Sequence, residues 1–453
     1  MRFIGSVYII RIEKMNSETK YQLYRYYKKS TYIDISKLNI SGIVDLYGYD
    51  DLVYFNCSHN SITKLINIPS RLKKLILSHN QIINFSKENF RGNDLNIFEF
   101  DNNPLTHLFY ALNKENILPN TLLELEFGIY FNKRVDNMLP NSITHLKFGR
   151  DFNQPVNNLP FSITHLTFGS YFNQMVDNLP SGITHLTFGE NFNKSIDNLP
   201  NSIIYLELGH TFNNSMDNLP NFITSLTLGD NFDKDIHQFP NSIKKIIFGN
   251  DYNKPIIKLP IHLTHLKFGN KFNQPIHELP ESLIHLELGK NFNNILCNLP
   301  NSLNCFVAHN WFNHMNEKIP INLENLIIMS SYDKNLNIPH GIKYLELNST
   351  NTDKKISIPN TVRKLVLGKN FCGKLNNLSD SIVEIIIDKN SLSNIKLVSL
   401  PDSVEVLQLN FTFCEKITKV PLNLKKIICC SDYEYINDFA NCLIETYEND
   451  TYY

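Results

Sequence analysis

Histidines recur at intervals of 20 residues along the middle of this 453-residue chain. Stacked imidazoles could bind a metal ion or gain charge as the pH falls, if the fold brings them together. No carboxylate or thiol shares their register to complete a metal site, so we predict no metal, cofactor or catalytic centre. In successive repeats this position holds His145, His165, His185, Tyr205, Ser225, Lys245, His265 and His285.

A second position, two residues further on, changes in charge and size from repeat to repeat. Its neighbours in the repeat are nearly constant apolar residues, so the variation is not needed to build the fold. A varied position beside constant ones is where a binding protein can encode specificity. It holds Lys147, Thr167, Thr187, Glu207, Thr227, Ile247, Lys267 and Glu287.

The element that must position both columns is a short strand within a 20-residue repeat. The repeat reads LPNSITHLKFGRDFNQPVNN at residues 139–158 and starts again at residue 159. Alternation in SITHLKF predicts a strand with Leu146 and Phe148 facing inward and His145 and Lys147 facing outward. The first apolar position of this frame occurs 16 times from Leu122 to Leu424.

Three earlier segments fit the pattern L-x-x-L-x-L-x-x-N-x-L, which is typical of leucine-rich repeats. They begin at Leu52, Leu72 and Leu95, which brings the expected number of repeats to 19. One repeat cannot bury both sides of its apolar layer, so the repeats must stack. We predict a leucine-rich-repeat-like solenoid of about 19 coils, with one long parallel β-sheet on the concave face, extended or turn-like return segments and few helices.

Two further columns carry turn chemistry. Gly149 recurs as glycine in most copies and as Asn348, Asp388 and Asn410 in later ones, which predicts a left-handed backbone at this position. Asn153 recurs as asparagine in nearly every copy, and we expect a ladder of side chains that bind turn amides between coils.

The pattern divides the chain into four segments. We expect an N-terminal cap over residues 1–50, leucine-rich repeats over 51–117, the 20-residue repeats over 118–430, and a C-terminal cap or tail over 431–453. One coil is unusual, because Ala308 replaces the inward Phe and the single tryptophan, Trp311, follows it. Two roles are possible for Trp311: it fills the space that Ala308 leaves in the core, or it is an exposed aromatic residue that anchors a partner.

Composition limits the functions that this chain can have. The net charge is −1 and only 19% of residues are charged, which argues against nucleic-acid binding. The eight cysteines form no CxxC pair or disulfide framework, which favours a reducing, cytoplasmic compartment. The apolar run Phe3–Ile10 is too short to span a membrane, and no cleavage site follows it.

The segments FNQPV (152–156), FNQMV (172–176), FNKSI (192–196), FNNSM (212–216) and FNQPI (272–276) resemble the FNIP repeat family. This family is found in amoebae and in the large DNA viruses that infect them, so a viral member would act in the host cytoplasm. The resemblance implies a leucine-rich-repeat-like fold that mediates protein interactions. Some members carry an N-terminal F-box that recruits a ubiquitin ligase. Residues 1–50 show no clear F-box, because 17–30 offers one short Tyr-rich helix and TYIDISKLNISGIVDL resembles strands.

We therefore expect a monomeric, non-enzymatic scaffold that binds a protein through its concave sheet face. The alternative is a substrate receptor or adaptor of a host ubiquitin ligase. The candidate contact residues are the two outward columns: His145, Lys147, His165, His185, Tyr205, Glu207, Lys245, His265, Lys267, His285 and Glu287.

Overall fold

The structure is a computed structural model that describes most of the chain. The described residues are 11–14, 29–82, 95–99, 103, 118, 120–294, 296, 298–309, 320–329, 336–348, 356–371, 378–391, 397 and 400–447. They belong to two compact units, Met1–Lys234 and Asp235–Tyr453, each treated by itself below. No helix among these residues is both long enough and apolar enough to cross a membrane.

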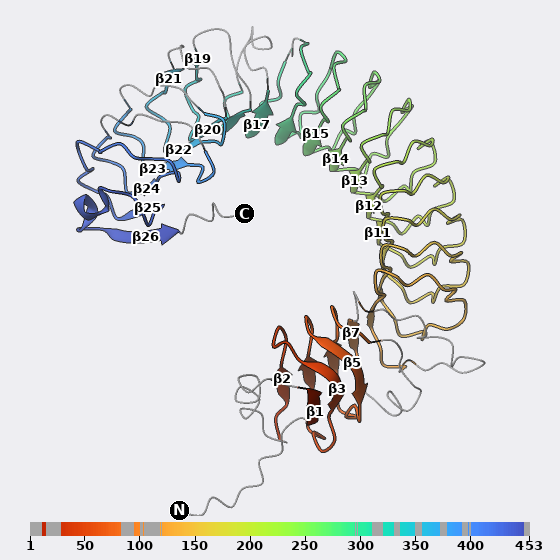
Figure 1. The fold of residues 1–453 in the computed structure, drawn as a ribbon. Helices are drawn as coiled ribbons and strands as arrows, with labels where there is room; N and C mark the ends of the chain where they lie inside the picture. The colour runs from red at the N-terminus through yellow and green to blue at the C-terminus, as the bar shows by residue number, and fades with distance from the viewer. Residues whose placement is uncertain are drawn as a thin grey trace, which may run out of the picture. The chain divides into compact units, whose positions relative to one another are not determined.

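The first unit is built on a parallel sheet in which each strand pairs with the next one along the chain (Figure 1). A smaller sheet lies beside its first coils, where β1 (Arg11–Lys14) pairs antiparallel with β3 (Ser41–Asp45) and β3 pairs in parallel with β5 (Ser61–Ile66). The main sheet comprises β2 (Tyr32–Asp34), β4 (Tyr54–Asn56), β6 (Lys74–Ile76), β7 (Ile97–Glu99), β8 (Glu124–Glu126), β9 (His145–Lys147), β10 (His165–Thr167), β11 (His185–Thr187), β12 (Tyr205–Glu207) and β13 (Ser225–Thr227).

The second unit continues the same construction, and its strands line the inner side of an arc while the return segments lie outside (Figure 1). Two short strands in the return segments, β19 (Leu336–Asn337) and β21 (Ile356–Ser357), form a second parallel pair. The main sheet comprises β14 (Lys245–Ile247), β15 (His265–Lys267), β16 (His285–Glu287), β17 (Cys305–Ala308), β18 (Asn325–Ile328), β20 (Tyr344–Leu347), β22 (Lys364–Leu367), β23 (Glu384–Ile387), β24 (Val406–Gln408), β25 (Lys426–Cys430) and β26 (Leu443–Tyr447).

The predicted solenoid is confirmed. Each of the 19 repeats expected from the sequence contains one strand of a main sheet, from β4 to β25. Two further strands of the main sheets lie outside those repeats, β2 before the first repeat and β26 after the last. Between β25 and β26 the chain forms a 3₁₀ helix, η3 (Ile436–Phe439), and Phe439 and Tyr433 are buried there.

The core consists of the apolar columns that recur in the sequence. Leu146 and Phe148 point inward and are 2% and 1% exposed. Phenylalanine rings stack both within a coil, with centroids of Phe148 and Phe152 3.8 Å apart, and between coils, with Phe148 and Phe168 5.6 Å apart. Stacked offset rings fill the space between strand and return segment, which explains why the column accepts little variation.

The predicted asparagine ladder is also confirmed. The side-chain oxygen of Asn153 accepts the backbone N–H of Asn173 at 2.9 Å, and the oxygen of Asn173 accepts the N–H of Asn193 at 3.0 Å. In the earlier repeats Asn80 has a similar role. It is 1% exposed, accepts a hydrogen bond from the N–H of Ile62 and donates to the carbonyls of Cys57 and Leu77. Each asparagine therefore supplies a hydrogen bond that the turn backbone would otherwise lack.

The left-handed turn predicted for the Gly149 column is wrong. None of Gly149, Asn348, Asp388 and Asn410 has a positive φ. The cause of the glycine preference is crowding between coils, because a Cβ placed on Gly169 would lie 2.0 Å from the carbonyl oxygen of Gly149. Glycine lets successive coils approach closely at this corner, which is its second common role besides unusual dihedral angles.

Candidate functional site

The parallel register aligns equal repeat positions on neighbouring strands. His145, His165 and His185 face one another across β9, β10 and β11, as do Leu146, Leu166 and Leu186. Because neighbouring strands lie about 4.8 Å apart, each repeat position becomes a column of side chains across the sheet. The outward columns form a solvated surface, which we call the sheet face.

All candidate contact residues lie on the sheet face, as predicted, and every one is exposed or half-buried. They fall into two groups, because β9 to β12 belong to the first unit and β14 to β16 to the second. The first group holds His145, Lys147, His165, His185, Tyr205 and Glu207, and the second holds Lys245, His265, Lys267, His285 and Glu287.

The three histidines of the first group form a stack. Ring centroids of His145 and His165 are 4.1 Å apart, and those of His165 and His185 are 4.2 Å apart. Each ring Nδ1 lies within hydrogen-bond distance of the preceding threonine hydroxyl, at 2.9 Å for Thr164 and His165. Burial lowers the pKa of His165, and the two neighbouring imidazoles lower it further. The His165 ring is therefore neutral near pH 7.

The second outward column carries charges that pair between strands. Lys147 lies 2.5 Å from Glu126 on β8, and Lys267 lies 2.8 Å from Glu287 on β16. These ion pairs are well exposed, so each contributes little to stability. They place side chains of opposite charge next to each other on the sheet face.

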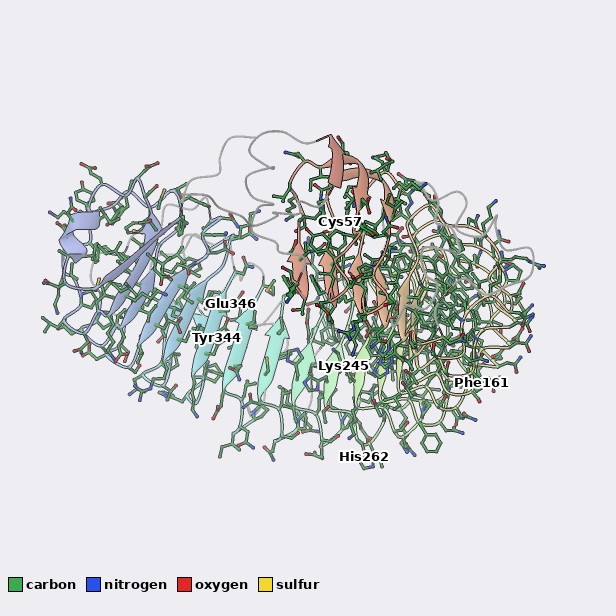
Figure 2. All side chains as sticks on the ribbon, turned by 90° about the horizontal axis from the view of Figure 1, so that it is seen from below. Cys57, Phe161, Lys245, His262, Tyr344 and Glu346 are labelled. Carbon is green, nitrogen blue, oxygen red and sulfur yellow. The ribbon has the colours of Figure 1, made fainter. Side chains whose placement is uncertain are left out.

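Tyrosine and glutamate also pair within single strands. The Tyr205 hydroxyl donates to Glu207 at 2.7 Å, and Tyr344 donates to Glu346 at 2.8 Å on β20, where both residues are labelled in Figure 2. Burial and the adjacent carboxylate raise the pKa of Tyr205 to about 12. These phenols therefore remain protonated donors at physiological pH.

A shallow depression of about 290 Å³ lies over β7 to β10 on the sheet face. The carboxylates of Glu99, Glu124 and Glu126 line it together with His145 and His165. The expectation that no carboxylate or thiol shares the histidine register is wrong, because Glu124 pairs with His145 and Cys305 pairs with His285 on neighbouring strands. Within the described parts of the chain, no group of three or more His, Cys, Asp or Glu residues has the geometry to hold a metal ion. The depression is open to solvent and is lined by both carboxylates and imidazoles.

The sequence reasoning missed an apolar stripe on the sheet face of the second unit. From β17 onward the second outward column changes from polar residues to Val and Ile. Charged side chains flank it and pair with one another, as Lys364 does with Glu384 at 3.0 Å. The sequence does contain the signal for this stripe, because strands such as NLII and EIII have an apolar residue at the second outward position. The stripe comprises the half-buried Ile327, Val366, Ile386 and Ile428, interrupted by Glu346 and Gln408, and Val307 in the same column is buried.

The unusual coil is described only up to His309. Ala308 is 1% exposed and takes the inward position expected of it. Trp311 lies outside the described residues, so both roles suggested for it stay predictions.

Comparison with known proteins identifies the type of repeat in the middle of the chain. The model of the FNIP repeat matches six overlapping segments: 112–151, 131–171, 172–211, 212–251, 235–271 and 272–305. These matches cover the repeats whose FNQP-like segments carry the Phe and Asn columns described above. None of the curated proteins compared with the chain matches it significantly.

Among solved structures, a circular leucine-rich-repeat protein of the giant virus CroV, CroV588, is 32% identical with a TM-score of 0.62. The match covers 85% of this chain but only 63% of that protein. YopM from Yersinia enterocolitica is 18% identical with a TM-score of 0.46, covering 92% of this chain and 87% of that one. InlJ from Listeria monocytogenes is 13% identical with a TM-score of 0.44, covering 77% and 75%. Residues 112–305 of this chain therefore consist of FNIP repeats, and they form part of a leucine-rich-repeat-like solenoid.

Proposed function

We propose that the protein is a non-enzymatic scaffold that binds a protein partner through its sheet face. The observation that carries the proposal is the contrast between columns. With exceptions such as Ala308, the inward columns stay Leu, Ile or Phe from coil to coil, while the outward columns on the same strands include His, Tyr, Lys, Glu and Thr. A fold that needs only the inward columns leaves the outward ones free to specify a partner.

The backbone of the sheet face supports recognition by side chains. The N–H and C=O groups of the inner strands are used in pairing with both neighbours, as in β10, which pairs with β9 and β11. A partner therefore docks against side chains rather than by adding a strand to this face. Exposed His and Tyr rings and Lys–Glu pairs offer the mixed polar and aromatic contacts that are typical of protein interfaces.

The apolar stripe of the second unit is the natural anchor for such a partner. Its Val and Ile side chains lie in one column, and the flanking charges already have partners. Covering an apolar column removes it from water without breaking those ion pairs, so it contributes favourably to binding. We propose that this stripe in the second unit and the polar columns of β9 to β12 in the first unit act as two contact areas, one in each unit.

We further propose a monomer in a reducing compartment, consistent with the cytoplasm. The six described cysteines, among them buried Cys57 and Cys429, are free. The paired charges of the sheet face form no basic surface of the kind that binds nucleic acid. For the ligase-adaptor alternative, the described part of residues 1–50 consists of strands β1 to β3, and no observation there favours an F-box. The short helix expected at 17–30 falls almost entirely outside the described residues.

A capture experiment tests the proposal. Tagged wild-type protein and a variant with Lys147→Glu, Glu207→Lys and Lys267→Glu would be purified from expressing cells, and bound proteins identified by mass spectrometry. A matched control carries Lys133→Glu and Lys258→Glu, which are exposed on return segments. The proposal expects the sheet-face variant to lose a partner that the control keeps. Equal capture of partners by the wild type, the sheet-face variant and the control would contradict the proposal. If the wild type captures ligase core subunits and a variant without residues 1–50 does not, the result would favour the adaptor alternative.

A further inference from the structure

Away from the sheet face, a concavity of about 880 Å³ lies in the first unit where the return segments meet the next coils. Its floor is apolar and buried, formed by Leu139, Leu159 and Pro160. Its walls are amide side chains, and Phe161 stands at its rim with 75% of its surface exposed. The amides are those of Asn120, Asn137, Asn141, Asn157 and Asn158.

Two departures from the repeat meet at this concavity. The return segment before it is one residue longer than usual, because Phe131 and Phe152 are 21 residues apart whereas Phe152 and Phe172 are 20 apart. The extra residue accompanies a left-handed backbone at Asn137, with φ of 57°. Phe161 is the second departure, because the same position is Asn141 in the preceding repeat and Ser181 in the following one. Folding explains neither change.

The amides of this concavity differ from those of later coils in their bonding. The amide of Asn198 donates to Asp177 at 3.0 Å, and the amide of Asn218 donates to Asp197 at 3.2 Å. In the concavity Asn157 stands where those coils have Asp. Within the described part of the chain, none of its five asparagine side chains makes a hydrogen bond. They are free to bind a ligand.

The geometry points to a site for a neutral carbohydrate. An asparagine amide presents a donor and an acceptor side by side, which suits neighbouring sugar hydroxyls that both donate and accept. An exposed aromatic ring can pack against the C–H face of a sugar ring and remove apolar surface from water. No charged side chain lines the concavity, so phosphate, carboxylate or sulfate groups would find no counter-charge. Its volume is within the range of small-ligand sites.

The test is binding of the full-length protein to an array of neutral oligosaccharides, followed by saturation-transfer NMR titration of the strongest sugar. Phe161→Asn and Asn157→Asp are expected to weaken its binding about fivefold to tenfold each. Both substitutions copy residues that neighbouring repeats carry at these positions, as Asn141 and Asp177 show, so the fold should tolerate them. Unchanged thermal unfolding of each variant would verify this.

A second exposed phenylalanine provides the control. Phe222 is 68% exposed but does not line the concavity, and Ser202 holds its position in the preceding repeat. Phe222→Ser should therefore leave sugar binding unchanged. The proposal is overturned if no neutral sugar binds, if binding survives both Phe161→Asn and Asn157→Asp, or if these substitutions abolish binding of an unmodified peptide instead of a sugar.

Discussion

The side-chain oxygen of Asn153 accepts the backbone N–H of Asn173, one coil further along, at 2.9 Å. The same relation repeats between Asn173 and Asn193 and again between Asn193 and Asn213. Each hydrogen bond ties the turn of one coil to the turn of the next. The FNQP-like segment therefore stabilises the stacking of neighbouring coils. Its constant sequence reflects this structural role and does not identify a binding partner.

Removing one step of this ladder should cost stability. We expect Asn153→Ala to lower the free energy of unfolding by about 1 kcal/mol, because the N–H of Asn173 loses its acceptor in a half-buried turn. Chemical denaturation followed by circular dichroism measures this. Asn153→Asp is the matched control, since Asp233 occupies the same column and a carboxylate still accepts the bond. Equal losses for both variants would contradict the ladder.

A methyl group in the glycine column should be far more damaging. A Cβ on Gly169 would lie 2.0 Å from the oxygen of Gly149, so Gly169→Ala must force two coils apart. We expect a loss of about 3 kcal/mol or more, which is at the upper end for overpacked sites. The measurement is the shift of the chemical denaturation midpoint.

At another glycine, Gly182, we expect a side chain to raise the stability of the protein. In the repeats on either side its position holds serine, and the hydroxyls of Ser162 and Ser202 donate to Ile143 and Ile183 at 2.7 and 2.6 Å. Gly182→Ser restores that bond and restricts the unfolded chain, so we expect a gain of about 0.5–1 kcal/mol. A large loss of unfolding free energy for Gly182→Ser would show that any side chain at these corners destabilises the protein. That result would contradict a clash specific to Gly169.

Sequence alone predicted the strands and the outward columns because both depend on a local period. Leu146 and Phe148 alternate with His145 and Lys147, and a repeat of 20 residues returns each to the same register. The reason for Gly149 could not be predicted, since it depends on the distance between coils. The pairing of β19 with β21 could not be predicted, because each of these strands has only two residues, too few to show the alternation that indicates a strand.

The stacked histidines predict a pH effect. Burial and the rings of His145 and His185 lower the pKa of His165 below its usual value of about 6.5, so the unfolded chain binds more protons than the folded one below that pH. Stability should be complete above about pH 6.5 and fall as the pH is lowered towards the folded-state pKa. Glu124 pairs with His145 at one end of the stack, and Tyr205 pairs with His185 at the other end.

The change to compare is His165→Ser, which copies Ser225 of the same column. Thermal unfolding would be measured from about pH 7.5 to about pH 5, on either side of the usual histidine pKa. The variant should lose less stability over this range than the wild type. An identical pH dependence in both proteins would show that the stack does not titrate in the way its geometry implies.

The central claim, that the sheet face binds a protein partner, is tested most directly by photo-crosslinking in expressing cells. A photoreactive amino acid would replace Thr187 on the sheet face in one protein and Lys194 on a return segment in another. The account predicts a discrete crosslinked partner from position 187 and none from position 194. Crosslinks to the same partner from position 194 alone would contradict it.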